Sequence, residues 1–130
     1  MKYLLDTNAV IALARRHPAF EARLVEHAPG DFGLSAIVLH ELYYGAYKGR
    51  RTAENLARIE ALQFEVVAFD SEDAHQAGAL RATLAAAGAP IGPYDALIAG
   101  QALARDLTLI THNTGEFQRV AGLRIEDWEI

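Results

Sequence analysis

Three acidic residues stand alone in apolar parts of the chain. They are Asp6, Glu41 and Asp95, each the only charged residue of its segment, and the segments are 3–14, 32–47 and 82–104. Burying an isolated carboxylate is costly unless a cation compensates it, and these segments contain no Lys or Arg. One divalent cation shared by all three acids would solve the problem. Ligands that offer only oxygen favour Mg²⁺ or Mn²⁺ over zinc.

Two of the three acids also have a simpler interpretation. Asp6 is placed to cap the helix that follows the first strand, with Asn8 as the rival cap. Asp95 falls at the third position of a helix opened by Pro93, where the helix dipole favours acids. Glu41 lies inside an apolar helix and has no capping role. The coincidence of all three favours the metal site.

Length and composition predict one globular domain over residues 1–130, with 52% hydrophobic and 22% charged residues. The absence of cysteine excludes disulfides, thiolate metal sites and a cysteine nucleophile, and suits a reducing compartment. The first apolar run is too short for a signal peptide, and glycines and prolines interrupt the stretch 82–104, so no membrane span is expected. We expect a cytoplasmic protein. The net charge of −5 argues mildly against binding nucleic acid.

Strand and helix signals alternate along the whole chain. Strands are expected at 2–6, 32–34, 64–69, 107–111 and 123–126. Helices are expected at 9–15, 18–27, 36–47, 53–62, 71–87 and 93–105. Ser35, Thr52 and Asp70 are the expected N-caps, with Asp73 completing a capping box. This alternation predicts an α/β fold, a three-layer α/β/α sandwich around a mainly parallel sheet.

In such folds ligands bind beyond the carboxyl ends of the strands. Asp6 ends the first strand, and Glu41 and Asp95 lie in the first two turns of helices that should start at the same edge. Three further polar residues follow the strand near 107–110, namely Thr111, Asn113 and Glu116. We therefore expect all six side chains to converge at one end of the sheet.

Four motifs resemble those of the PIN domain, and more narrowly those of VapC-type toxins from bacterial toxin–antitoxin pairs. They read LDTN at 5–8, ELYYG at 41–45, IGPYDALIA at 91–99 and THNTGEF at 111–117. One such motif is weak evidence, whereas four in order with similar spacing are strong. The resemblance covers residues 2–128.

The resemblance implies a Mg²⁺- or Mn²⁺-dependent endoribonuclease. Its substrates would be structured RNA, often tRNA, and the most similar subgroup suggests the anticodon loop of an initiator tRNA. Its partners would be a cognate VapB-like antitoxin and a second copy of the chain in a homodimer.

By matching position, the resemblance also implies roles for individual residues. Asp6, Glu41 and Asp95 would be the acidic metal ligands. The fourth acidic position is shared between Glu116, as a further catalytic carboxylate, and Asn113, as a supporting polar residue. Thr7 and Thr111 would form hydrogen bonds to the carboxylates or to bound water.

With these acids assigned to the metal, the rest of the chain is nearly neutral, so RNA contacts must come from local basic clusters. Lys48, Arg50 and Arg51 form one candidate, and the pair at 15–16 another, although both also suit solvated helix ends. The tyrosines at 43, 44 and 47 have a helical spacing that favours packing in a core or a dimer over stacking on bases. The five histidines show no metal-ligand spacing.

Two other functions compete with the ribonuclease. A non-catalytic PIN-like scaffold that binds a protein is the first, and the intact acids speak against it. A phosphatase with an aspartyl nucleophile is the second, but that chemistry usually has another Asp two residues further on, where Asn8 stands.

Overall fold

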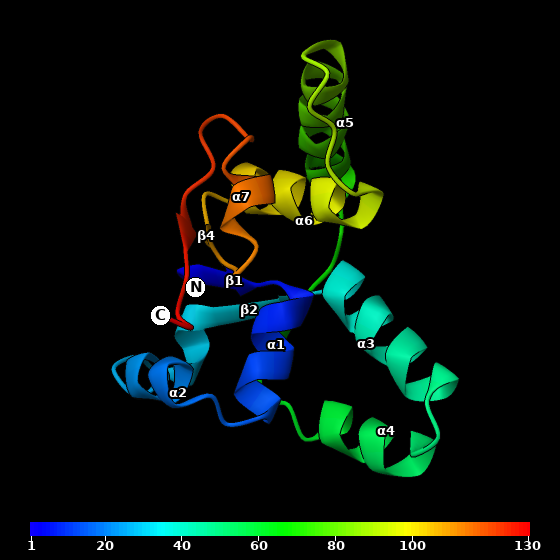
Figure 1. Ribbon diagram of the computed structural model, residues 1–130, viewed down its shortest axis with the longest axis vertical. Helices are drawn as coiled ribbons and strands as arrows, with labels where there is room; N and C mark the ends of the chain where they lie inside the picture. Colours follow the sequence, from blue (N-terminus) through cyan, green and yellow to red (C-terminus); the bar gives the residue numbers. More distant parts are fainter.

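The computed structural model describes residues 1–130 and is built on a sheet of five parallel strands in the order β3-β2-β1-β4-β5 (Figure 1). The strands are β1 (Tyr3–Leu5), β2 (Phe32–Ser35), β3 (Glu65–Val67), β4 (Thr108–Ile110) and β5 (Ile125–Glu126). In the centre, Leu4 pairs with Gly33 on one side and with Leu109 on the other. The inner strands are almost wholly buried, as expected for a parallel sheet covered on both faces.

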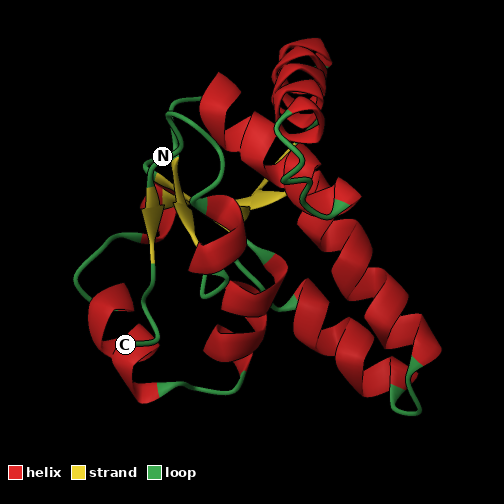
Figure 2. Ribbon diagram, turned by 45° about the horizontal axis from the view of Figure 1, so that its top comes forward, coloured by secondary structure: helices red, strands yellow, loops and turns green.

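Helices cover both faces of this sheet, which confirms the predicted α/β/α layers. The helices are α1 (Thr7–Ala14), α2 (Pro18–Leu24), α3 (Ala36–Lys48), α4 (Thr52–Glu60), α5 (Ser71–Ala86), α6 (Pro93–Ala104) and α7 (Thr114–Phe117). Helices α1 to α4 lie on one side, and α5 to α7 lie on the other, with α5 projecting from the body (Figure 1). Figure 2 shows α3 and α4 side by side, joined by a short turn, and the C-terminus next to α2. No helix has the length and apolar character needed to cross a membrane.

The expected caps at Ser35 and Asp70 are present. The Ser35 hydroxyl accepts from the backbone N–H of Ile37, and Asp70 and Asp73 form a reciprocal capping box. The prediction for Thr52 was wrong, because Thr52 is the first helical residue of α4 and its hydroxyl donates back to the Gly49 carbonyl.

Several element ends also differ from expectation. Helix α1 begins two residues earlier than predicted, since Asp6 rather than Asn8 caps it. Helix α2 ends three residues earlier, and β3 is shorter at both ends. Short strands are sufficient here because most of their stabilisation comes from burial in the core rather than from length.

The strand order places β1 at a topological switch point. The chain leaves β1 towards β2 through helices on one face, and later returns to β4 on the other side of β1 through helices on the opposite face. In open parallel sheets this arrangement leaves a crevice beyond the carboxyl ends of the central strands.

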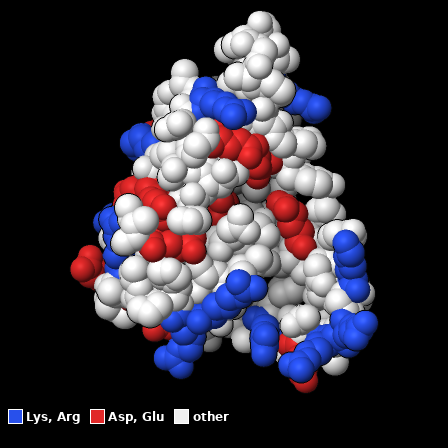
Figure 3. Space-filling view, in the orientation of Figure 1, with Lys and Arg blue, Asp and Glu red and all other residues white.

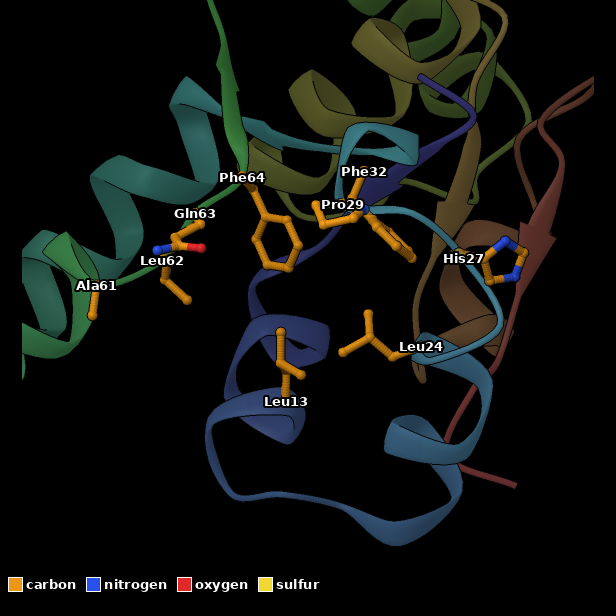
Figure 4. Close-up of a pocket in the computed structure, with 9 residues that line it drawn as sticks. All are labelled: Leu13, Leu24, His27, Pro29, Phe32, Ala61, Leu62, Gln63 and Phe64. Atoms are coloured by element: carbon orange, nitrogen blue, oxygen red, sulfur yellow. The ribbon is translucent and has the colours of Figure 1, made fainter.

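An apolar hollow of about 310 Å³ lies away from that crevice. Figure 4 shows Leu13, Leu24 and Phe64 pointing towards one another between α1, α2 and the segment before β3. Phe32 in its lining is the first residue of β2, at the amino end of the sheet, and His27 is the one titratable group. This lining offers no set of groups for catalysis.

Candidate active site

Asp6 leaves β1 at its carboxyl end and is only 4% exposed. Its Oδ1 accepts a hydrogen bond from the backbone N–H of Ala9 at 2.7 Å, so it caps α1 and lies in the crevice at the same time. Burial raises the pKa of Asp6, while hydrogen bonds from Thr111 and Ala9 oppose the shift. The charges of Glu129 and Glu41 raise the pKa further. Capping fixes the orientation of this carboxylate.

Glu41 reaches the crevice from the second turn of α3. The Thr7 hydroxyl donates to Glu41 Oε1 at 3.0 Å, which joins the start of α1 to α3. Ser35 ends β2 and caps α3, so the sheet edge itself determines where this helix starts. Thr7 therefore holds one oxygen of Glu41 beside Asp6.

Asp95 and Glu116 form a close pair on the opposite side of the crevice. Asp95 is the third residue of α6, after Pro93 at its first position, and Glu116 lies on α7. Burial is the main cause that raises the pKa of Asp95 to about 7, followed by a hydrogen bond with Glu116 and the charges of nearby acids. Asp95, rather than Glu116, is therefore the carboxyl group of the pair that keeps a proton to about pH 7 in the metal-free site.

Glu116 is held in place by donors on both of its oxygens. The Gly92 N–H donates to Oε1 at 2.7 Å, and Asn113 Nδ2 donates to Oε2 at 2.8 Å. Burial raises the pKa of Glu116, but the hydrogen bonds from Gly92 and Asn113, the hydrogen bond with Asp95 and the charge of Arg119 together outweigh it and leave the pKa lowered. Asn113 therefore acts on Glu116, and the backbone N–H of Asn113 also donates to the Thr111 hydroxyl at 2.9 Å.

Gly92 borders both carboxylates of this pair. A Cβ at Gly92 would lie 3.4 Å from Asp95 Oδ2 and 3.6 Å from Glu116 Oε1. The absence of a side chain keeps that side of the two carboxylates open.

None of the four acids forms an ion pair with a Lys or Arg, although the charge of Arg119 acts on Glu116. The ion pairs of the chain all involve other carboxylates. Figure 3 shows acidic side chains across the middle of one face, with basic ones around its edges. Mutual repulsion that raises carboxyl pKa values, and donors that are all oxygen, are the properties of a site for a hard divalent cation. The residues present therefore fit a hard divalent cation.

The structure thus brings together seven of the ten residues selected from the sequence. They are Asp6, Thr7, Glu41, Asp95, Thr111, Asn113 and Glu116. The basic residues Lys48, Arg50 and Arg51 do not join them, because they lie at the other end of α3 and in the turn that follows. Lys48 is seven residues further along α3 than Glu41, about 10 Å along the helix axis.

A second polar cluster lies beside the site and was not found from the sequence. His112 Nδ1 is 2.9 Å from Asp127 Oδ2 and 4.0 Å from Glu129 Oε2. The hydrogen bond with Asp127 and the charges of both acids raise the pKa of His112. No spacing in the sequence predicts this cluster. Asp127 and Glu129 follow β5, and they come close to His112 only because β5 lies beside β4 in the sheet. Glu129 also lies close enough for its charge to act on Asp6.

Comparison with known proteins finds similarity to PIN domains and VapC proteins over nearly the whole chain. A family model described as "PIN domain" matches residues 3–123. The tRNA(fMet)-specific endonuclease VapC of Shigella flexneri is 42% identical over 130 residues, covering 98% of each chain, and that of Salmonella typhimurium is 40% identical with the same coverage.

Solved structures agree with this. The DNA-bound VapBC structure from Salmonella typhimurium has a TM-score of 0.92 and 39% identity, covering 98% of each chain. The VapBC-1 structure from nontypeable Haemophilus influenzae has a TM-score of 0.90 and 34% identity, covering 100% of each chain. This chain therefore belongs to the PIN-domain family and, within it, to the VapC group of ribonucleases.

Proposed function

We propose that the chain is an endoribonuclease that hydrolyses RNA phosphodiesters with Mg²⁺ or Mn²⁺ held by Asp6, Glu41 and Asp95. The observation that carries the proposal is the convergence of four carboxylates without a basic partner, with the pKa of Asp95 raised to about 7. When bound, the divalent ion lowers the pKa of water and shields the charge of the phosphodiester.

The residues of the chain orient the reaction. The Ala9 N–H and the Thr111 hydroxyl hold Asp6, and the Thr7 hydroxyl holds Glu41. Water adds to phosphorus in line and the P–O3′ bond breaks, which leaves a 5′-phosphate and a 3′-hydroxyl. In the metal-free site Asp95 keeps a proton to about pH 7, which a bound cation would displace, and Glu116 lies beside it as a carboxylate with a lowered pKa that could accept a proton.

The test is cleavage of RNA by the purified chain in Mg²⁺ or Mn²⁺, compared with EDTA and with Asp6→Asn. Asn also caps helices, so this variant should keep α1 intact. We expect cleavage by the wild type only, with oxygen from labelled water in the 5′-phosphate. Trapping a phospho-enzyme would instead support the aspartyl phosphatase. Binding of a protein without any RNA cleavage would support the non-catalytic scaffold.

We further propose that the substrate is tRNA, with an initiator tRNA as the first candidate. The support is the full-length similarity to relatives named tRNA(fMet)-specific endonucleases. Incubation with total tRNA, followed by mapping of the new 5′ ends, tests this directly. Cleavage spread over messenger RNA with tRNA left intact would contradict it.

A VapB-like antitoxin is the proposed partner, since the similar solved structures are VapBC complexes. We place the toxin in the cytoplasm with its RNA substrate and expect it to form a homodimer. Expression of the chain alone should arrest growth, and co-expression of the neighbouring small reading frame should restore it. Arrest that persists in Asp6→Asn would show that RNA cleavage is not the cause.

A further inference from the structure

One face of α3 exposes a row of rings. His40, Tyr44 and Tyr47 follow each other at intervals of four and three residues, which places them on one face of the helix. All three are exposed, and the exposed fractions of Tyr44 and Tyr47 are 61% and 67%. Tyr44 and Tyr47 are therefore not core residues of the chain, and packing of these tyrosines in a dimer, the other part of the expectation, stays a prediction.

Tyr94 extends this row to the carboxylates. Its ring is 48% exposed and lies 5.5 Å from the His40 ring, centroid to centroid, at an interplanar angle of 50°. Tyr94 immediately precedes Asp95, and His40 immediately precedes Glu41. We call the row formed by Tyr94, His40, Tyr44 and Tyr47 the ring strip. One of its ends therefore lies beside the proposed metal ligands.

The other end of the ring strip is basic. Lys48 Nζ lies 5.6 Å from the centroid of the Tyr44 ring, within the range of a cation–π contact. Arg50 and Arg51 follow in the exposed turn, and Arg51 approaches only Glu54, at 4.0 Å. The ring strip thus runs from the carboxylates at one end to three cations at the other.

The charge of the molecule explains why such a surface matters. A chain with net charge −5 and four clustered acids repels the phosphate backbone of RNA. Stacking of bases on aromatic rings does not depend on charge and contributes about 1–3 kcal/mol per base. A ring strip with a few cations at one end therefore supplies affinity that the overall charge cannot.

We propose that single-stranded RNA lies along α3, with its bases stacked on the ring strip and its phosphates near Lys48, Arg50 and Arg51. This rests on the proposed ribonuclease function and adds the surface that positions the substrate. Continuity with the proposed metal ligands favours RNA over a second copy of the chain, because a strand bound on the ring strip leads directly to these ligands and its phosphates meet three cations at the far end. A second copy is the alternative outcome of the test.

The experiment measures binding of a short, labelled single-stranded RNA in the Asp6→Asn background, where cleavage should not occur. An oligonucleotide of equal length without bases serves as the matched ligand. Tyr44→Ala and Tyr47→Ala should each weaken binding of the normal RNA about 5- to 150-fold and leave binding of the abasic RNA unchanged. Tyr44→Trp should retain the affinity, since its ring also stacks.

Lys48→Ala should act differently from the tyrosine variants. It should weaken both oligonucleotides and reduce the slope of log K against log salt by about 0.7. Val25→Ala and Arg81→Ala, which alter an exposed apolar and an exposed basic residue elsewhere, are the controls and should bind like the parent.

The proposal would be overturned if the tyrosine variants bound normal RNA as tightly as the parent does. It would also be overturned if they lost the same affinity for the normal and the abasic oligonucleotide. Conversion of a dimer into a monomer by Tyr44→Ala would overturn it as well, because the ring strip would then be an interface between copies. Failure of the proposed function itself is a separate result, since the wild-type chain would then cut no RNA at all.

Discussion

Asp95 has a carboxyl group that keeps its proton to about pH 7, mainly because of burial and then because of Glu116. The folded state therefore binds one more proton than the unfolded state between about pH 4 and 7, so this group destabilises the metal-free protein as the pH rises through that range. Ionised Asp95 therefore destabilises the metal-free protein most at and above neutral pH, where the enzyme would bind its cation.

Asp95→Asn should therefore raise the melting temperature in EDTA at pH 7, and the gain should shrink towards pH 4. Cleavage in Mg²⁺ or Mn²⁺ should fall by at least about 10- to 100-fold, the loss typical of residues that only support a metal ligand. Thermal unfolding across pH and a cleavage assay test both effects. Asp106→Asn, at an exposed position with φ of 54° that Asn tolerates, is the matched control. A gain in melting temperature that does not vary with pH would contradict the raised pKa of Asp95.

Glu116 and Asn113 have separable roles, because the amide of Asn113 donates to the carboxylate of Glu116. Glu116→Gln offers one acceptor oxygen where two donors need one each, so it should lower the free energy of unfolding by about 1–2 kcal/mol. It should also lower cleavage about 10- to 100-fold. Asn113→Ala leaves the Gly92 donor in place and should lower cleavage less. The reverse order of activities would make Asn113 the fourth site residue.

At the scale of elements, α6 carries Asp95 and depends on its contact with α5. A Cβ at Gly100 would lie 2.5 Å from the backbone of Ala77, so these helices meet almost backbone to backbone. Buried polar groups tie the same elements together. Asp73 accepts from Gln101 Nε2 at 3.1 Å, and Arg105 bonds both Asp73 and the Ala68 carbonyl. Burial raises the pKa of Asp73, but the hydrogen bonds it accepts outweigh this and lower it.

Gly100→Ala should push α5 away from α6 and lower the free energy of unfolding by about 1–3 kcal/mol. Gly78→Ala is the matched control on the exposed side of α5, where nothing lies within 4 Å of the added Cβ. It should raise the free energy of unfolding by about 0.5–1 kcal/mol, since Ala favours a helix over Gly. Urea unfolding of both variants tests the pair. An unchanged free energy of unfolding in Gly100→Ala would mean that α5 and α6 can move apart without loss of stability.

For the whole molecule, the proposed cation should couple binding to stability. At a concentration 100 times its Kd, Mg²⁺ or Mn²⁺ should raise the free energy of unfolding by about 2.7 kcal/mol. Asp6→Asn should lose most of this gain, and KCl of equal ionic strength should not reproduce it in the wild type. Thermal unfolding with and without each salt measures the effect. An equal gain in Asp6→Asn would place the ion elsewhere, and the cluster of His112, Asp127 and Glu129 would be the first place to look.

The layers of the fold and the convergence of the acids were predictable because they depend on local patterns. Period-two and helical spacing, together with the caps at Ser35 and Asp70, determine where elements start. A residue at the carboxyl end of a parallel strand must then lie at the common edge. The double role of Asp6 follows from the same geometry, since the residue that ends β1 also precedes α1.

The isolation of Asp6, Glu41 and Asp95 among apolar residues was thus determined by the sequence alone, as was their place at one sheet edge. Only the tertiary structure decided that Glu116 pairs with Asp95 while Asn113 supports it, because that depends on α6 and α7 meeting across Gly92. It also decided that Tyr44 and Tyr47 are exposed and that His112 meets Asp127. These are contacts between distant segments, and helical or strand periodicity does not determine which side chains meet across elements.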